Sequence, residues 1–121
     1  MDIRKLQKIV VSALEDIKGK DIEVINTSKL TSMFDRMVIV TGDSNRQVRS
    51  LAANVQDKVK EAGGEVLSTE GEDSGEWVLV DLGDVVVHVM QPTVRQYYNL
   101  EELWQATPSQ RKKAAEQGKT E

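Results

Sequence analysis

The spacing of apolar residues changes repeatedly along the chain, and this alternation constrains the fold more than any other feature of the sequence. Residues 3–17 and 48–62 place apolar side chains at steps of three and four, which predicts two amphipathic helices. Residues 92–104 show the same spacing and predict a last helix. Short runs rich in β-branched residues predict strands at 21–26, 36–41, 65–68, 77–81 and 84–90. The order α-β-β-α-β-β-β-α predicts an α/β fold, a mixed β-sheet with flanking helices.

Several positions carry local signals. Ser44 and Gln47 have the spacing of a capping box, which predicts the start of the second helix. Gly83 lies in a short turn between the last two strand runs, which predicts an antiparallel hairpin. The continuous apolar run at residues 36–41 predicts a central strand buried on both faces. In the first strand, the side chains expected to face inward are Ile22 and Val24, with Ile25 as a third candidate.

The length of 121 residues is typical of one domain, and apolar periodicity ends near Thr107. We therefore predict one α/β domain over residues 1–104 and a flexible basic tail over residues 105–121. The tail holds four basic and two acidic residues, a charge of +2, so the total of −4 leaves −6 on the domain. An acidic domain suits a basic protein partner and argues against general nucleic-acid binding. Solubility alone would also account for this charge.

The chain has no cysteine, which excludes a disulfide scaffold, a Cys-based zinc site and a thiol nucleophile. Lys8, Glu15 and Asp16 interrupt every apolar stretch that a signal peptide would need near the N-terminus. No apolar run approaches the length of a membrane helix. These features predict a cytoplasmic protein that does not bind membranes.

His88 is the only histidine, and it lies within the last predicted strand. It shares a period-two face with Val86 and Met90, a position typical of a structural histidine. A zinc site needs three or four ligands, and the chain has no second His and no Cys to supply them. No serine lies in a Gly-x-Ser-x-Gly elbow. We therefore predict no catalytic residue, no metal and no cofactor.

An enzymatic alternative uses Asp81 and Asp84 as Mg²⁺ ligands and the glycine-serine junction at residues 42–44 as a phosphate cradle. Nucleotidyl transfer needs carboxylates on one face of a strand, hence an Asp-x-Asp spacing. Asp81 and Asp84 are three residues apart across a turn, where Asp is also favoured for local reasons. This alternative is therefore the weaker prediction.

Aromatic residues are concentrated near the C-terminus. The chain has five, and four of them (Trp77, Tyr97, Tyr98 and Trp104) lie within residues 77–104. Tyr97 and Trp104 fall on the apolar stripe of the last predicted helix, which favours core packing. Trp77 follows an acidic loop and Tyr98 lies off the stripe, so both are candidates for a protein interface.

Three segments resemble one known family. They are Glu70–Trp77, Val80–Met90 and Tyr97–Trp104, supported upstream by Lys18–Asp21 and Val40–Arg46. Together they resemble the Iojap-related ribosomal silencing factors over about residues 3–104. The resemblance implies a nucleotidyltransferase-like fold without catalytic carboxylates, and a protein that is not an enzyme.

The resemblance also implies a partner. Members of this family bind the large ribosomal subunit through its L-fourteen-type protein, block association with the small subunit and repress translation when nutrients are short. The implied binding residues are Trp77, Asp81, Leu82, Gly83, Tyr97 and Tyr98. Direct nucleic-acid binding is not expected, and the basic tail is the one segment that could contact ribosomal RNA. A homodimeric module that uses the same aromatic patch on itself is the main alternative.

Overall fold

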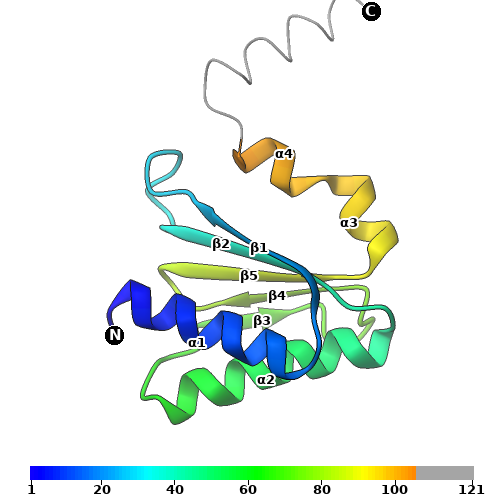
Figure 1. The fold of residues 1–121 in the computed structure, drawn as a ribbon, viewed down its shortest axis with the longest axis horizontal. Coiled ribbons are helices and arrows are strands. Elements are labelled where there is room, and N and C mark those ends of the chain that lie inside the picture. The colour runs from blue at the N-terminus through cyan, green and yellow to red at the C-terminus, as the bar shows by residue number, and fades with distance from the viewer. Residues whose placement is uncertain (106–121) are drawn as a thin grey trace, which may run out of the picture.

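The computed structural model describes residues 1–105, which form one five-stranded sheet and four helices (Figure 1). The helices are α1 (Ile3–Asp16), α2 (Asn45–Glu61), α3 (Pro92–Tyr98) and α4 (Leu100–Gln105). The strands are β1 (Lys20–Asn26), β2 (Arg36–Thr41), β3 (Ser68–Glu70), β4 (Trp77–Asp81) and β5 (Val85–Met90). The predicted α/β fold with a sheet and flanking helices is confirmed.

The strands lie in the order β1-β2-β5-β4-β3. β2 and β5 pair in parallel, and the remaining neighbours pair antiparallel, so the sheet is mixed as predicted. The predicted hairpin is confirmed by the antiparallel register of β4 and β5, in which Trp77 lies opposite Met90 and Asp81 opposite Val86. The sheet therefore joins β2 to a strand that follows it by more than forty residues in the chain.

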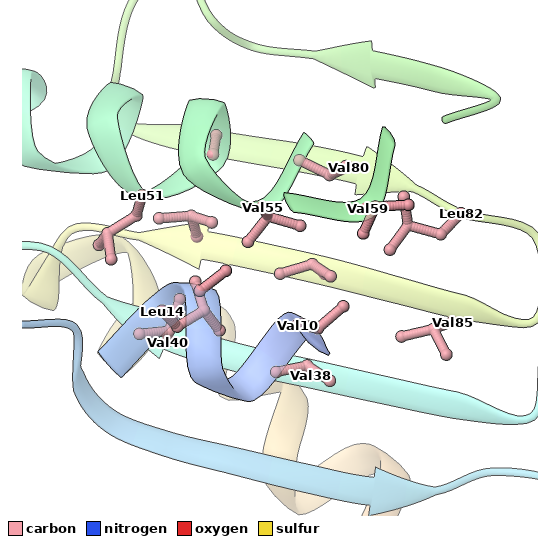
Figure 2. Close-up of a cluster of buried hydrophobic side chains, with 14 of the residues drawn as sticks. Val10, Leu14, Val38, Val40, Leu51, Val55, Val59, Val80, Leu82 and Val85 are labelled. Atoms are coloured by element: carbon pink, nitrogen blue, oxygen red, sulfur yellow. The ribbon is translucent and has the colours of Figure 1, made fainter. Parts of the chain in front are cut away.

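The two long helices cover one face of the sheet and enclose the main core (Figure 1). Val10 and Leu14 of α1 meet Val55 and Val59 of α2 there, above inward-facing valines such as Val38 (Figure 2). The side-chain amide of Asn54 also donates a hydrogen bond of 2.7 Å to the carbonyl of Ala13, which ties α2 to α1. Alternation along each strand sends the intervening residues to the other face.

The second face of the sheet has a smaller core beneath α3 and α4 (Figure 1). Its buried members are Ile25, Met37, Ile39, Val86 and Met90. Phe34, Val94, Leu100 and Trp104 pack against them. β2 is consequently buried on both faces, as its continuous apolar run predicted. The cover thins toward β4, where Trp77 and Leu79 are only half-buried.

The start of α2 follows the predicted capping box in part. The Ser44 hydroxyl accepts a hydrogen bond of 3.1 Å from the backbone N–H of Gln47. The side-chain oxygen Oε1 of Gln47 accepts a hydrogen bond of 2.7 Å from the backbone N–H of Asp43, one residue before the cap, instead of from that of Ser44. Two backbone N–H groups are satisfied in either arrangement.

The predicted last helix is in fact two short helices. Asn99 adopts a left-handed conformation with φ 47°, which ends α3 and turns the chain before α4 begins. The third strand also begins later than predicted, at Ser68 instead of Glu65. Its pairing with β4, and not its apolar run, sets these bounds.

The first strand departs from its predicted burial. Ile25 is buried in the second core, and Ile22 packs against the main core on the opposite face. Val24 lies opposite Val38 and therefore on the main-core face, as predicted, but it remains 38% exposed because β1 is an edge strand. The register of β1 shifts only before this pair, between Lys20 and Glu23, around Asp21 at φ 51°.

Of the predicted tail, Gln105 ends α4, and residues 106–121 lie outside the described part of the chain. None of the helices within residues 1–105 has the length and apolar character needed to cross a bilayer.

Candidate functional site

Four rings gather at one end of the sheet and form what we call the aromatic cluster: Trp77, His88, Tyr97 and Tyr98. The Trp77 and Tyr98 ring centroids are 4.7 Å apart, and those of Trp77 and His88 are 5.8 Å apart. Tyr97 meets Tyr98 edge-on at 5.0 Å. Trp77 opens β4, His88 lies in β5 and the tyrosines end α3, so tertiary packing assembles the cluster.

The members of the cluster are exposed to very different extents. Trp77 is half-buried and packs against the second core. Tyr98 is 53% exposed and Tyr97 is 82% exposed. The predicted core position of Tyr97 is therefore wrong, because α3 ends one residue later and Asn99 redirects the chain. Trp104 does pack against the second core as predicted, with its ring 5.4 Å from that of Phe34.

His88 has a hydrogen-bond partner within the cluster. The indole N–H of Trp77 donates to Nδ1 of His88 at 3.0 Å. Burial lowers the pKa of His88 to about 4, because the protein withholds water from the charged form. The imidazole is thus neutral near pH 7 and can offer a lone pair to the indole.

The Asp81–Gly83 turn lies at the other end of β4. One carboxylate oxygen of Asp81 accepts a hydrogen bond of 2.9 Å from the N–H of Gly83, which has φ 88°. The Leu82 side chain is only 7% exposed and belongs to the main core. Its implied role as a surface contact therefore conflicts with its burial, because the turn directs this leucine beneath the helices.

The six implied binding residues do not form one compact group. Trp77, Tyr97 and Tyr98 are together, whereas the turn lies about 13 Å away along the four residue steps of β4. Strand alternation places Leu79 and Asp81 on the same face as Trp77. Leu79 and His88 share this face, but neither is among the six implied binding residues. Period-two alternation from Trp77, combined with the hairpin register, would have indicated both.

An acidic loop over residues 71–76 precedes Trp77 and is fastened to the start of α2. The Arg49 side chain donates hydrogen bonds to the carbonyls of Glu72, at 2.8 Å, and of Asp73. At Gly71, φ is 89° and an added Cβ would lie 2.0 Å from the carbonyl oxygen of Trp77. The carboxylates of the acidic rim, which we define as Glu70, Glu72, Asp73 and Glu76, belong to exposed residues.

The structure separates the residues that the enzymatic alternative requires. Gly42 donates its N–H to the carbonyl of Met90, at the C-terminal end of β5. Asp84 precedes the N-terminal end of that strand, about 16 Å away along its length. Within residues 1–105, no three His, Cys, Asp or Glu side chains are grouped so that they could hold a metal ion.

A polar cleft of about 420 Å³ lies beyond the C-terminal ends of β2 and β5. Its cationic side chains are engaged by other residues. Lys20 pairs with Asp43, and Arg95 contacts Glu101 at 3.2 Å and Thr41 at 2.8 Å. The hydrogen bond that Lys20 donates to Asp43, together with the attraction of that carboxylate, raises the pKa of Lys20.

The fold and the site define a class: a single-sheet α/β domain that exposes an aromatic cluster beside an acidic rim. Its sequence matches the family described as "Ribosomal silencing factor during starvation" over residues 1–121. The chain therefore belongs to the ribosomal silencing factor (RsfS) family.

Individual relatives agree with this assignment. The chain is 62% identical to "Ribosomal silencing factor RsfS" of Chromobacterium violaceum over 104 residues, covering 86% of this chain and 85% of that protein. It is 40% identical to the Bacillus subtilis protein of the same name over 108 residues, covering 89% and 92%. A crystal structure of a Chromobacterium violaceum protein superposes with a TM-score of 0.86 at 61% identity, covering 88% of this chain and 89% of that one. The implied likeness to nucleotidyltransferases stays a prediction.

Proposed function

We propose that this chain is a ribosomal silencing factor that binds the large ribosomal subunit through its L-fourteen-type protein. Binding at the face where the small subunit docks would block subunit association and repress translation during nutrient limitation. The mechanism is steric and needs no catalytic group. Support comes from membership of the family and from relatives that carry the name ribosomal silencing factor over nearly their whole length.

The observation that carries the proposal is the aromatic cluster. Tyr97 and Tyr98 are both exposed residues, and the ring of the half-buried Trp77 packs against that of Tyr98. Tyrosine and tryptophan are the side chains most often found at the energetic centre of protein interfaces. Of these three rings, Trp77 packs against the second core, so its side chain loses little conformational freedom on binding.

The acidic rim indicates that the partner surface is basic. Glu70, Glu72, Asp73 and Glu76 lie in or beside the loop that leads into Trp77. The domain around them carries most of the negative charge of the chain. Such a rim would attract a basic ribosomal protein and orient the encounter, while the aromatic rings would make the dry centre of the contact.

The proposal is tested by co-sedimentation with large subunits and by the yield of joined ribosomes. Trp77→Ala should weaken binding by about 2 kcal/mol, roughly thirtyfold, because it removes the ring that supports Tyr98. It should also restore subunit joining. Far-UV circular dichroism and thermal unfolding establish that the variant is folded.

Met33→Ala is the matched control, since Met33 is 81% exposed in the loop between β1 and β2, at the other end of the sheet. It should bind like the wild type. Equal binding by folded Trp77→Ala would contradict the assignment of the aromatic cluster. A wild-type protein that leaves subunit joining unaffected, but doubles in mass by light scattering, would favour the homodimeric alternative.

A further inference from the structure

The Trp77–His88 contact is set by the register of two neighbouring strands. Trp77 lies opposite Met90, and Leu79 lies opposite His88. His88 is thus the diagonal neighbour of Trp77 on the same face, at a separation that aromatic side chains can span. The contact therefore depends on the pairing of β4 with β5, and not on the exposed end of α3.

The hydrogen bond identifies the form of the imidazole. Nδ1 accepts from the indole nitrogen at 3.0 Å, so its lone pair is unprotonated and the ring proton lies on Nε2. Because burial keeps the pKa of His88 near 4, this neutral form persists across the physiological pH range. The bond thus occupies the only polar atom of the Trp77 side chain.

Trp77 also contacts a second ring of the cluster, that of Tyr98. Its ring lies 4.7 Å from that of Tyr98 at an interplanar angle of 49°. His88 fixes the position of the indole nitrogen, while Tyr98 limits rotation of the ring. The indole has little freedom to turn its N–H outward.

We propose that His88 is a positioning residue for the partner contact, which holds the indole nitrogen of Trp77 inward so that only the carbon edge of the ring meets the partner. The inference rests on the proposed function and deepens it. The partner surface must then offer Trp77 an apolar recess, not a hydrogen-bond acceptor. Polar recognition is left to the acidic rim and to the tyrosine hydroxyls.

Two substitutions separate positioning from simple space filling. His88→Leu keeps a side chain of similar bulk but removes the acceptor. His88→Asn keeps a carbonyl oxygen close to the place of Nδ1. The indole N–H resonance of Trp77, assigned by its loss in Trp77→Phe, reports the hydrogen bond through its chemical shift and its rate of exchange with solvent.

We expect His88→Leu to expose the Trp77 indole N–H to rapid exchange and to weaken large-subunit binding about tenfold. His88→Asn should restore both properties toward the wild type. Thermal unfolding of each variant shows whether the fold is intact. Wild-type affinity in His88→Leu, or an unchanged indole resonance in that variant, would overturn the inference.

The outcomes also distinguish this inference from the proposed function. If the wild-type protein does not co-sediment with large subunits, the proposed function fails, and the role of His88 in a partner contact fails as well. The indole resonance in His88→Leu and His88→Asn then still decides whether His88 holds Trp77. If the wild type binds large subunits and both variants bind as tightly as the wild type, only the positioning role of His88 fails.

Discussion

At the scale of single residues, His88 is a polar ring in a site that excludes most water. Its neutral form suits that site, because the imidazole accepts a hydrogen bond from Trp77 and carries no charge that would need hydration. Protonation would place a hydrogen on the very nitrogen that accepts the bond. The same residue therefore links the geometry of the aromatic cluster to acid stability.

The first prediction at this scale concerns pH. The pKa of His88 is about 4 in the folded protein, against an ordinary value of 6.5, so the unfolded chain binds more protons between these values. This contribution to stability is complete above pH 6.5 and is lost as the pH falls toward 4. The free energy of unfolding should therefore fall between pH 7 and about pH 4.5, and the fall should be roughly 2 to 3 kcal/mol larger for the wild type than for His88→Leu. Urea unfolding of both proteins at the two pH values measures it. Equal losses in the two proteins would contradict the lowered pKa.

The second prediction concerns Leu82. Because this side chain is buried in the main core, Leu82→Ala should lower the free energy of unfolding by about 2 to 4 kcal/mol. Leu67→Ala is the matched control, since Leu67 is 57% exposed, and it should change stability by no more than about 0.5 kcal/mol. Urea unfolding measures both. Wild-type stability in Leu82→Ala would return this leucine to the candidate surface contacts.

At the scale of elements, the acidic loop over residues 71–76 connects β3 to β4 and leads directly into Trp77, the first residue of β4. Arg49 of α2 holds two carbonyls of the loop, and the Gln91 side chain holds the carbonyl of Gly75 at 3.1 Å. Contacts from α2 and from the residue that follows β5 thus fix a loop that buries few apolar side chains of its own.

A third prediction follows for this loop. Arg49→Ala removes both hydrogen bonds to the loop, so amide exchange in residues 71–76 should quicken. Large-subunit binding should weaken about threefold, because the acidic rim is no longer held in place. Arg46→Ala, an exposed arginine one turn earlier on α2, is the control and should leave loop exchange unchanged. Unaltered exchange in Arg49→Ala would show that the loop is held by other contacts.

At the scale of the whole molecule, charge and aromatic surface are arranged around one end of the sheet. The domain carries a net charge of about −6, with the acidic rim beside the aromatic cluster. Such an arrangement acts on the rate of association more than on the final contact, since charges at the rim remain solvated.

The fourth prediction is therefore a dependence on salt. Association with large subunits should slow by about tenfold between roughly 0.05 M and 0.5 M salt, because screening shortens the reach of the acidic rim. The double change Glu72→Gln with Asp73→Asn should reduce both the rate and its salt dependence. Dissociation should change little, which stopped-flow fluorescence or surface plasmon resonance can establish. A rate that rises with salt would indicate an acidic partner surface.

Much of this molecule could be predicted from its sequence, because the signals are local. The spacing of Val48, Leu51 and Val55 defines a helix face whatever the helix packs against. The β-branched runs around Gly83 define a hairpin, since a short turn brings two such runs side by side in antiparallel orientation. The clustering of Trp77, Tyr97 and Tyr98 near the C-terminus also indicated the region of the candidate surface.

Only the tertiary structure decided which side chains of that region face solvent. Tyr97 lies on a helical stripe that looks buried, but a single left-handed residue at Asn99 ends the helix and leaves the ring exposed. Leu82 lies in a turn that looks exposed, but the turn closes over the main core. His88 meets Trp77 because β5 pairs with β4 in one register. Periodicity describes one element at a time, whereas burial and contact depend on the neighbours that the completed sheet provides.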